Sequence, residues 1–205
     1  MSDQQNTSHW PAFYKARAGR PPRPLLLDVL ARSEAGAVDG AERQAIDLGC
    51  GDGTETAVLL QHGWHVLALD REPEAMAYVQ AKVTPEHQSR LEIRIAAFEE
   101  MRLPPADLVY AGLSLPFCAP EHFDAVWVRI VAALRPGGRF AGHFFGVHDS
   151  WADDPAMTFH TSDQVRQLLQ GFAVEYFHEL DEDGMAFSGP KHWHVFEVIA
   201  RKATD

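Results

Sequence analysis

The stretch Ala45-Ile46-Asp47-Leu48-Gly49-Cys50-Gly51-Asp52-Gly53-Thr54 decides the fold. It opens with a short apolar run, which is typical of a buried strand. Closely spaced glycines follow, and they let the backbone turn sharply and approach a ligand before a helix predicted for Thr54–Gln61. The stretch therefore predicts a strand, a loop and a helix, with a ligand site at the carboxyl end of the strand.

An acidic residue ends the next predicted strand. Asp70 follows the apolar run His65–Leu69 and lies about 20 residues beyond Gly49, the separation at which a carboxylate can accept hydrogen bonds from the ribose hydroxyls of an adenosine. The glycine loop and Asp70 together indicate a cofactor that contains a nucleoside.

The glycine spacing distinguishes two cofactor classes. A dinucleotide fingerprint needs glycine at position 54, where this chain has Thr54. Asp47 and Asp52 place negative charge beside the loop, which disfavours a pyrophosphate and favours an ammonium group. S-adenosylmethionine carries such an ammonium, together with a sulfonium and a ribose, so we expect it here in preference to a nicotinamide cofactor.

The rest of the chain alternates between strand and helix patterns. Further strands are predicted at Leu91–Ile95, Asp107–Ala111 and Arg139–Phe145, with a turn at Leu134–Gly138 before the last of these. This alternation favours a parallel sheet covered on both faces. The final strands, Phe172–Leu180 and His192–Ala200, follow each other without a helix, so at least one of them should be antiparallel.

Composition limits the class of protein and its partners. The chain has 205 residues, with 46% hydrophobic and 23% charged, which fits one globular domain. Its net charge of −11 would repel nucleic acid and anionic membranes. Cys50 and Cys118 offer neither a disulfide framework nor zinc-type spacing, and the start of the chain lacks a signal peptide. We therefore expect a cytoplasmic protein that binds neither nucleic acid nor membrane.

With these motifs the chain resembles the class I S-adenosylmethionine-dependent methyltransferases, and within that class the small bacterial tellurite-resistance methyltransferases. Besides residues 45–54, the resemblance rests on Leu69-Asp70, Asp107–Tyr110 and Leu134–Gly138. It implies an α/β fold, a Rossmann-like doubly wound sheet of seven strands in the order 3-2-1-4-5-7-6, with strand 7 antiparallel. It also implies a single methyltransferase domain over residues 1–205, with an N-terminal lid or helical segment at 1–43 and a core at 44–202.

The resemblance also implies a cofactor site. Its glycines would wrap the methionine end, Asp47 would orient the ammonium and Asp70 would hold the ribose. Many relatives have Asp where this chain has Ala97, so Glu99 or a backbone carbonyl would have to accept from the adenine amino group. The implied cofactor-binding residues are Asp47, Gly49, Cys50, Gly51, Gly53, Asp70, Arg71, Ala97, Phe98, Glu99, Ala111 and Gly112.

Methyl transfer is an in-line displacement at a carbon that the sulfonium already activates, so the protein mainly aligns the nucleophile and excludes water. A general base is needed only when the acceptor carries a proton. The sequence therefore leaves the catalytic residue unknown, and the candidates are Tyr14, Tyr110, Ser114, His143 and His148.

An aromatic and basic segment precedes the core. Trp10, Phe13 and Tyr14 stand near Arg17, Arg20 and Arg23, and the segment either folds over the cofactor as a lid or packs on the domain as an N-terminal staple. Further along, His192 and His194 share one face of a predicted strand. Their spacing matches no defined metal motif, so we expect no metal site.

The expected function is methyl transfer to a small-molecule acceptor. A non-catalytic S-adenosylmethionine-binding protein on the same fold is the alternative, and Thr54 and the acidic loop weigh against a nicotinamide oxidoreductase. The sequence leaves the acceptor open among a chalcogen oxyanion such as tellurite, a thiol, an amine, a carboxylate and a phenol. It also leaves open whether the protein is a monomer or a homodimer.

Overall fold

The computed structural model describes residues 10–16, 19–35 and 42–204. The helices and strands are, in chain order, α1 (Trp10–Ala16), α2 (Pro24–Glu34), β1 (Gln44–Leu48), α3 (Thr54–Gln61), β2 (His65–Asp70), α4 (Pro73–Lys82), η1 (Pro85–Arg90), β3 (Leu91–Ile95), η2 (Phe98–Glu100), β4 (Ala106–Ala111), η3 (Leu115–Phe117), α5 (Pro120–Ala133), β5 (Leu134–Gly146), β6 (Phe159–His160), α6 (Ser162–Leu168), β7 (Phe172–Ala186) and β8 (Gly189–Lys202).

The sheet has the predicted topology. Its strands lie in the order β3-β2-β1-β4-β5-β8-β7, with β1 to β5 parallel to one another and β8 antiparallel to both β5 and β7. A short strand that the sequence did not predict, β6, pairs with β5 and raises the numbers of the last two strands by one. The predicted order and the antiparallel last strand are therefore confirmed.

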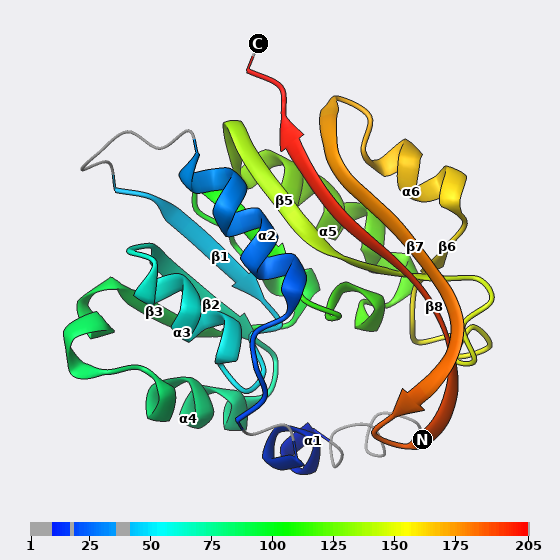
Figure 1. The fold of residues 1–205 in the computed structure, drawn as a ribbon, viewed down its shortest axis with the longest axis horizontal. Helices are drawn as coiled ribbons and strands as arrows, with labels where there is room; N and C mark the ends of the chain where they lie inside the picture. Colours follow the sequence, from blue (N-terminus) through cyan, green and yellow to red (C-terminus); the bar gives the residue numbers. More distant parts are fainter. Residues whose placement is uncertain (1–9, 17–18, 36–41, 205) are drawn as a thin grey trace.

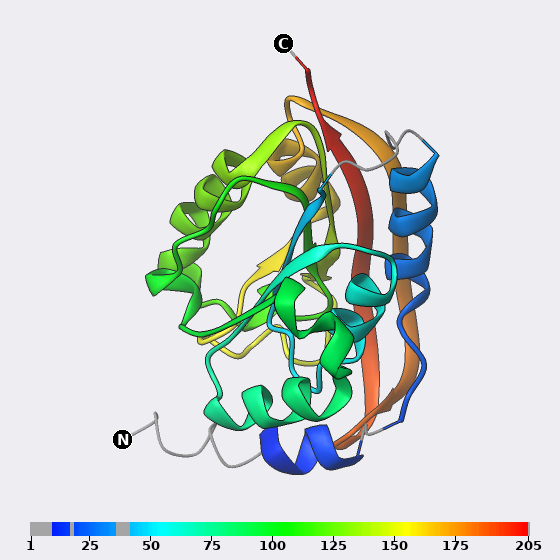
Figure 2. The ribbon, with the colours of Figure 1, turned by 90° about the vertical axis from the view of Figure 1, so that its left-hand side faces the viewer.

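Helices cover both faces of the sheet. One face packs its apolar side chains against α2, α3 and α4, and the other packs against α5 and α6. Figure 2 shows α5 and α2 on opposite sides of the sheet, and Figure 1 shows the strands between them. The two layers leave the carboxyl ends of β1, β2, β4 and β5 together at one edge, which is where such sheets bind ligands.

Local sequence signals set where several helices begin. Pro24 and Pro73 stand at the starts of α2 and α4, where the missing N–H of proline costs nothing. α6 begins with a capping box: the hydroxyl of Thr161 accepts from the N–H of Gln164 at 3.3 Å, and the N–H of Thr161 donates to Oε1 of Gln164 at 2.8 Å.

The predicted boundaries of three strands, β5, β7 and β8, are wrong. The segment Leu134–Gly138, predicted as a turn, belongs to β5, and a bulge there interrupts the pairing of β5 with β4. The final strands also run further than predicted, to Ala186 in β7 and from Gly189 in β8. These extensions pair with each other beyond the rest of the sheet and form a long hairpin. Their sequence has little of the apolar alternation that would predict a strand.

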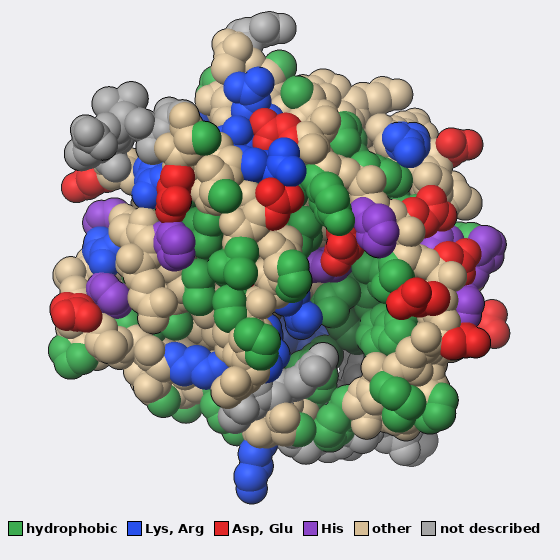
Figure 3. All heavy atoms as spheres, viewed as in Figure 1, with side chains coloured by type: hydrophobic (Ala, Val, Ile, Leu, Met, Phe, Trp, Pro, Cys, Tyr) green, Lys and Arg blue, Asp and Glu red, His purple; other side chains and the backbone are tan. Residues whose placement is uncertain are grey.

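The surface is hollowed beside this hairpin. Figure 3 shows a recess between the α2 side of the molecule and the β7–β8 hairpin, with hydrophobic side chains inside it. In the part of the chain that the structure describes, each helix is too short or too polar to cross a membrane.

Candidate active site

The glycine loop lies at the carboxyl ends of β1 and β2. Gly49, Gly51 and Gly53 have φ angles of 70°, 51° and 73°, a left-handed conformation that L side chains rarely adopt. The N–H groups of Gly49 and Cys50 both donate to the carbonyl of Leu69, at 2.7 and 3.1 Å. The loop is therefore fastened to the end of β2, and its glycines are required by the backbone conformation.

Asp70 lies directly against this loop. Its Oδ2 accepts from the N–H of Gly51 at 2.8 Å, and its Oδ1 accepts from the N–H of Glu72 at 3.0 Å. The side chain is 6% exposed, and burial raises its pKa while the two N–H donors lower it. A carboxylate has about four acceptor positions, so Asp70 keeps capacity for the hydroxyls of a ribose.

Asp47 is a second buried carboxylate at this edge of the sheet. It is 1% exposed and accepts a hydrogen bond from Oγ1 of Thr56 at 2.6 Å. Burial raises the pKa of Asp47 to about 7. A cation placed beside it would favour the charged carboxylate, so the residue is suited to an ammonium group.

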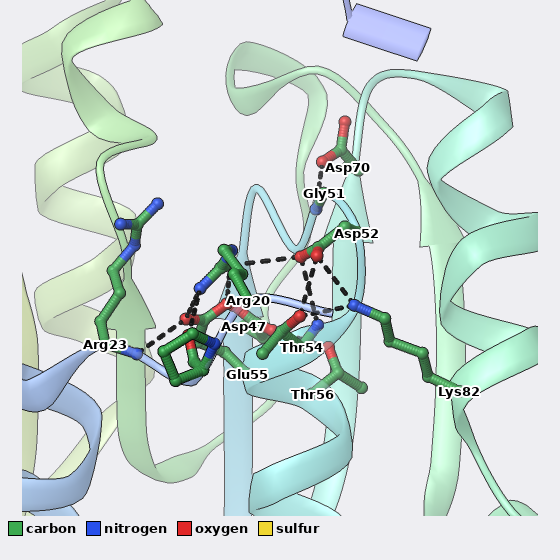
Figure 4. Close-up of polar contacts among 11 residues, drawn as sticks. Arg20, Arg23, Asp47, Gly51, Asp52, Thr54, Glu55, Thr56, Asp70 and Lys82 are labelled. Atoms are coloured by element: carbon green, nitrogen blue, oxygen red, sulfur yellow. Dashed lines mark hydrogen bonds and ion pairs between the residues drawn. The ribbon is translucent and has the colours of Figure 1, made fainter. Parts of the chain in front are cut away.

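Asp52, which the sequence predicted to add negative charge to the loop, is already paired. Its carboxylate lies 2.8 Å from Nζ of Lys82 and 3.2 Å from the guanidinium of Arg20. Figure 4 shows these three side chains together. Arg20 also bonds through its guanidinium to Glu55, which is 4% exposed. The charge of Asp52 is therefore offset within the protein, and Asp47 and Asp70 supply the acidic character of the site.

The N-terminal aromatic residues lie over the glycine loop. A Cβ on Gly51 would be 3.2 Å from the ring of Tyr14, which is 4% exposed. The ring of Trp10 lies 4.9 Å from that of Phe117 in η3, and the ring of Phe13 lies 5.9 Å from that of Phe187 at the hairpin tip. α1 therefore contacts the loop, η3 and the hairpin together.

The basic residues of this segment differ in their placement. Arg20 joins α3 through Glu55, and the backbone N–H of Arg23 donates to the same carboxylate at 3.2 Å. Arg17 lies outside the described residues. The predicted association of this segment with the glycine loop thus rests on Tyr14 and Arg20.

The residues predicted to border the adenine lie beyond β2 and β3. Ala97 and Phe98 are half-buried. The residue before them, Ala96, donates its N–H to the carbonyl of Asp70 at 3.0 Å. Arg71 is exposed and lies 3.1 Å from Glu72. The side chain of Glu99 is exposed, while its carbonyl accepts from Arg129 at 2.6 Å.

The loop after β4 contains a strained residue that sequence reasoning missed. Leu113 has a φ of 58° and is the one non-glycine residue with positive φ among those described. It follows the predicted residues Ala111 and Gly112, and the next residue, Ser114, donates its hydroxyl to the carbonyl of Leu48 at 2.5 Å. Such strain gathers at binding sites, but nothing in the local sequence signals it.

The structure brings some catalytic candidates together and separates another. Tyr110 and His143 lie on one face of the adjacent strands β4 and β5, and Ser114 and Tyr14 both contact the glycine loop. His148 instead lies in the hairpin region, where its Nδ1 is 2.9 Å from Asp181 and its ring stacks on that of His194 at 4.7 Å.

Near the hairpin, two histidines and an aspartate lie close enough together to be considered as metal ligands. His148, Asp181 and His194 each offer one ligand atom within 4.8 Å of the others. Nδ1 of His194 accepts the N–H of His148 at 3.1 Å, and its Nε2 lies 3.0 Å from Glu179. Because these hydrogen bonds already occupy the ring nitrogens, we interpret the cluster as a fastening of the hairpin.

A buried ion pair near the hairpin also escaped sequence reasoning. Lys191 is 5% exposed, pairs with Asp149, and lies 4.1 and 4.3 Å from the ring centres of Trp151 and Trp193. The residues come from separate parts of the chain, so only the folded structure reveals the pair.

Comparison with known proteins agrees with this geometry. Residues 45–138 match the family model described as a methyltransferase domain. This part of the chain is similar to a methyltransferase domain. The matched segment contains the glycine loop, Asp70 and the loop after β4, and the match agrees with the methyltransferase family predicted from the sequence.

Solved structures of methyltransferases share the fold of this chain. TehB from Haemophilus influenzae gives a TM-score of 0.73 at 14% identity, over 94% of this chain and 66% of that one. The 1,6-didemethyltoxoflavin-N1-methyltransferase from Burkholderia thailandensis gives 0.63 at 22% identity, over 96% and 87%. The N-methyltransferase NodS from Bradyrhizobium japonicum gives 0.65 at 13% identity, over 96% and 98%. No curated protein sequence matches the chain.

Proposed function

We propose that the protein is an S-adenosylmethionine-dependent methyltransferase that acts on a small-molecule acceptor by in-line methyl transfer. The observation that carries the proposal is the pair of buried carboxylates at the glycine loop, with Asp70 on the N–H of Gly51 and Asp47 at the end of β1. A ribose and an ammonium are the two groups of the cofactor that such carboxylates recognise.

The residues present fit this cofactor. The left-handed glycines remove side chains where a ligand must approach the backbone, and a pyrophosphate would meet two buried carboxylates there. Asp70 would bind the ribose hydroxyls, Asp47 would hold the ammonium, and Ala97 and Phe98 would border the adenine. When bound, S-adenosylmethionine supplies a methyl group activated by its sulfonium.

The protein's own part in the reaction would be to align the acceptor and exclude water. α1 lies over the glycine loop and contacts η3 and the hairpin, so we propose that the segment 1–43 serves as a lid on the core 44–202. The alternative of a purely structural staple predicts no change in α1 when the cofactor binds.

The solved relatives support a small acceptor. The Burkholderia enzyme was solved with 1,6-didemethyltoxoflavin and S-adenosylhomocysteine, and NodS was solved with S-adenosylhomocysteine. The net charge of −11 argues against a nucleic-acid substrate. Both cysteines are free, as we expect for a protein of the reducing cytoplasm.

Calorimetry with S-adenosylhomocysteine tests the proposal. The wild-type protein should bind one equivalent, and Asp70→Ala should abolish binding. Asp107→Ala is the matched control, because Asp107 also accepts a backbone N–H, from Gln44 at 2.8 Å, but at the amino end of β4. Absence of binding by the wild type would refute the proposal.

A labelled-methyl assay separates the enzyme from a non-catalytic binding protein. Incubation with methyl-labelled S-adenosylmethionine and a small-molecule extract should transfer label to the extract. Binding without any transfer would favour the non-catalytic alternative.

A further inference from the structure

A row of polar side chains crosses one face of the sheet beside the proposed cofactor site. Tyr110 of β4 pairs with Ala141 of β5, and His143 of β5 pairs with Glu197 of β8. Residues two apart on a strand share a face, so Tyr110, His143 and Glu197 all point to the side that α2 covers.

Two of these side chains have polar atoms that lack partners. Tyr110 is 1% exposed and His143 is 4% exposed. Among the described residues, neither the hydroxyl of Tyr110 nor Nδ1 of His143 has a hydrogen-bond partner. A buried polar atom without a partner has lost its hydrogen bonds to water and gained none in return, which destabilises the fold. Two such atoms on adjacent strands indicate a place where a ligand supplies the missing partners.

Glu197 fixes the orientation of the histidine ring. Its Oε1 lies 3.4 Å from Nε2 of His143, and its Oε2 accepts from the hydroxyl of Tyr176 at 3.3 Å. This arrangement places a proton on Nε2 and leaves a lone pair on Nδ1. The ring is thus in the tautomer that a general base requires.

The row lies next to the proposed cofactor site. Tyr110 pairs with Asp47 of β1 and precedes the predicted cofactor residues Ala111 and Gly112. A Cβ on Gly112 would be 2.9 Å from the hydroxyl of Tyr110, so a larger residue at this position would crowd that hydroxyl. The recess beside the hairpin in Figure 3 opens on the same face of the molecule.

We propose that Tyr110 and His143 bind the methyl acceptor and that His143 removes its proton as the methyl group is transferred, with Glu197 as a positioning residue. This inference rests on the methyltransferase function proposed above. The acceptor's O–H or N–H bond breaks, the proton goes to Nδ1 of His143, and the acceptor's electron pair forms the bond to the methyl carbon. The electron pair of the breaking carbon–sulfur bond stays on sulfur, which leaves a neutral thioether.

The charges around His143 suit this role. Burial lowers its pKa, and the guanidinium of Arg23 lowers it further, so the ring is neutral before reaction. Glu197 and the carbonyl of Ala111 favour the protonated ring, so they stabilise it once the proton arrives. The acceptor class is therefore a small molecule with an acidic O–H or N–H, such as a phenol or a nitrogen heterocycle. A thiolate or an oxyanion such as tellurite would need no such base.

Binding of 4-nitrophenol to protein saturated with S-adenosylhomocysteine tests the proposal, because the absorbance of this probe reports its ionisation. In the wild type the phenolate band should appear at a lower pH than in free solution. His143→Gln should lose that shift, and Tyr110→Phe should weaken binding about fivefold through one lost hydrogen bond. Glu197→Gln should move the pH at which the band appears without changing the affinity for S-adenosylhomocysteine.

His178→Gln is the matched control. Nδ1 of His178 also faces Glu197, at 3.6 Å, but its side chain is 51% exposed. This variant should behave as the wild type. If nitrophenol does not bind the loaded protein, or if its ionisation is the same in His143→Gln, the acceptor site is refuted. If S-adenosylhomocysteine itself fails to bind, the proposed function falls, and this inference falls with it.

Discussion

Replacing Gly49 with alanine tests whether the glycine loop is packed as the structure shows. The φ of Gly49 is 70°, so any L side chain there is strained, by about 1 kcal/mol for alanine. A Cβ at this position would also be 2.4 Å from Cβ of Ser114, which cannot stay where it is. Ser114 donates its hydroxyl to the carbonyl of Leu48, so moving it also loses that hydrogen bond.

The expected loss of stability follows from these three effects. Overpacking costs about 1 to 3 kcal/mol and the hydrogen bond about 1 kcal/mol, which with the backbone strain gives about 3 to 5 kcal/mol for Gly49→Ala. For a chain of this length the midpoint of thermal unfolding should fall by roughly 6 to 20 °C.

Gly63→Ala is the control for backbone strain alone. Its φ is 83°, and a Cβ there would meet nothing within 4 Å. This variant should lose about 1 kcal/mol, or roughly 2 to 4 °C in thermal unfolding. Differential scanning calorimetry of the two variants gives the comparison. Equal losses would show that the side chain of Ser114 does not rest on Gly49, which would refute the packing argument for the loop.

Three further predictions concern buried charges. Arg20→Ala should lower the free energy of unfolding by about 3 kcal/mol, because it leaves Glu55 buried without its charged partner, and an unchanged urea midpoint would argue against the pair. Asp149→Ala should lower the free energy of unfolding, measured by chemical denaturation, by about 3 to 5 kcal/mol, because it leaves Lys191 buried without its partner. The double variant Asp149→Ala/Lys191→Met should lose less, and a double variant no more stable than the single one would contradict this reasoning. Burial raises the pKa of Asp47 from its ordinary 3.8 to about 7, so the folded protein binds this proton more tightly than the unfolded chain does, and wild type should lose stability relative to Asp47→Asn as pH rises from about 4 to 7. Urea unfolding at several pH values measures this difference, and a constant difference would refute it.

The geometry of the candidate site at the carboxyl ends of β1 and β2 was predictable because its signals are local. Glycines between an apolar run and a helix require a sharp turn, and the acid after the next run follows at a separation set by one strand–helix–strand unit. Gly51 and Asp70 were predicted as site residues from separate signals in the sequence, and in the structure the N–H of Gly51 donates to Asp70 at 2.8 Å. The class of cofactor was predicted from the same residues. That prediction also used the negative charge of Asp52, which Lys82 offsets in the structure.

Other features depend on register between distant strands and were not predictable. Tyr110 and His143 were separate candidates, and only the pairing of β4 with β5 places them on one face. The ion pair of Lys191 and Asp149 joins β8 to the loop after β5, and no spacing in the sequence indicates it. His148 was a candidate because it follows β5, but its bond to Asp181 fastens it to the hairpin.

In the β7–β8 hairpin, strand pairing continues beyond the residues whose hydrophobic pattern predicts a strand. β7 continues to Ala186 and β8 begins at Gly189. The side chains of these extensions are mostly exposed and lack the alternation of a half-buried strand. Cross-strand hydrogen bonds and the pair of His192 with Asp183, at 2.8 Å, hold this extension together. Its tip reaches α1 through Phe187, which places it at the edge of the proposed active site.

A crystal structure of the protein with S-adenosylhomocysteine would locate the cofactor directly. We predict that the ribose hydroxyls lie within hydrogen-bond distance of the Asp70 carboxylate, with the ammonium near Asp47 and the amino acid end along Gly49–Gly53. A ligand bound at another edge of the sheet, or a ribose that makes no contact with Asp70, would contradict the assignment of this site.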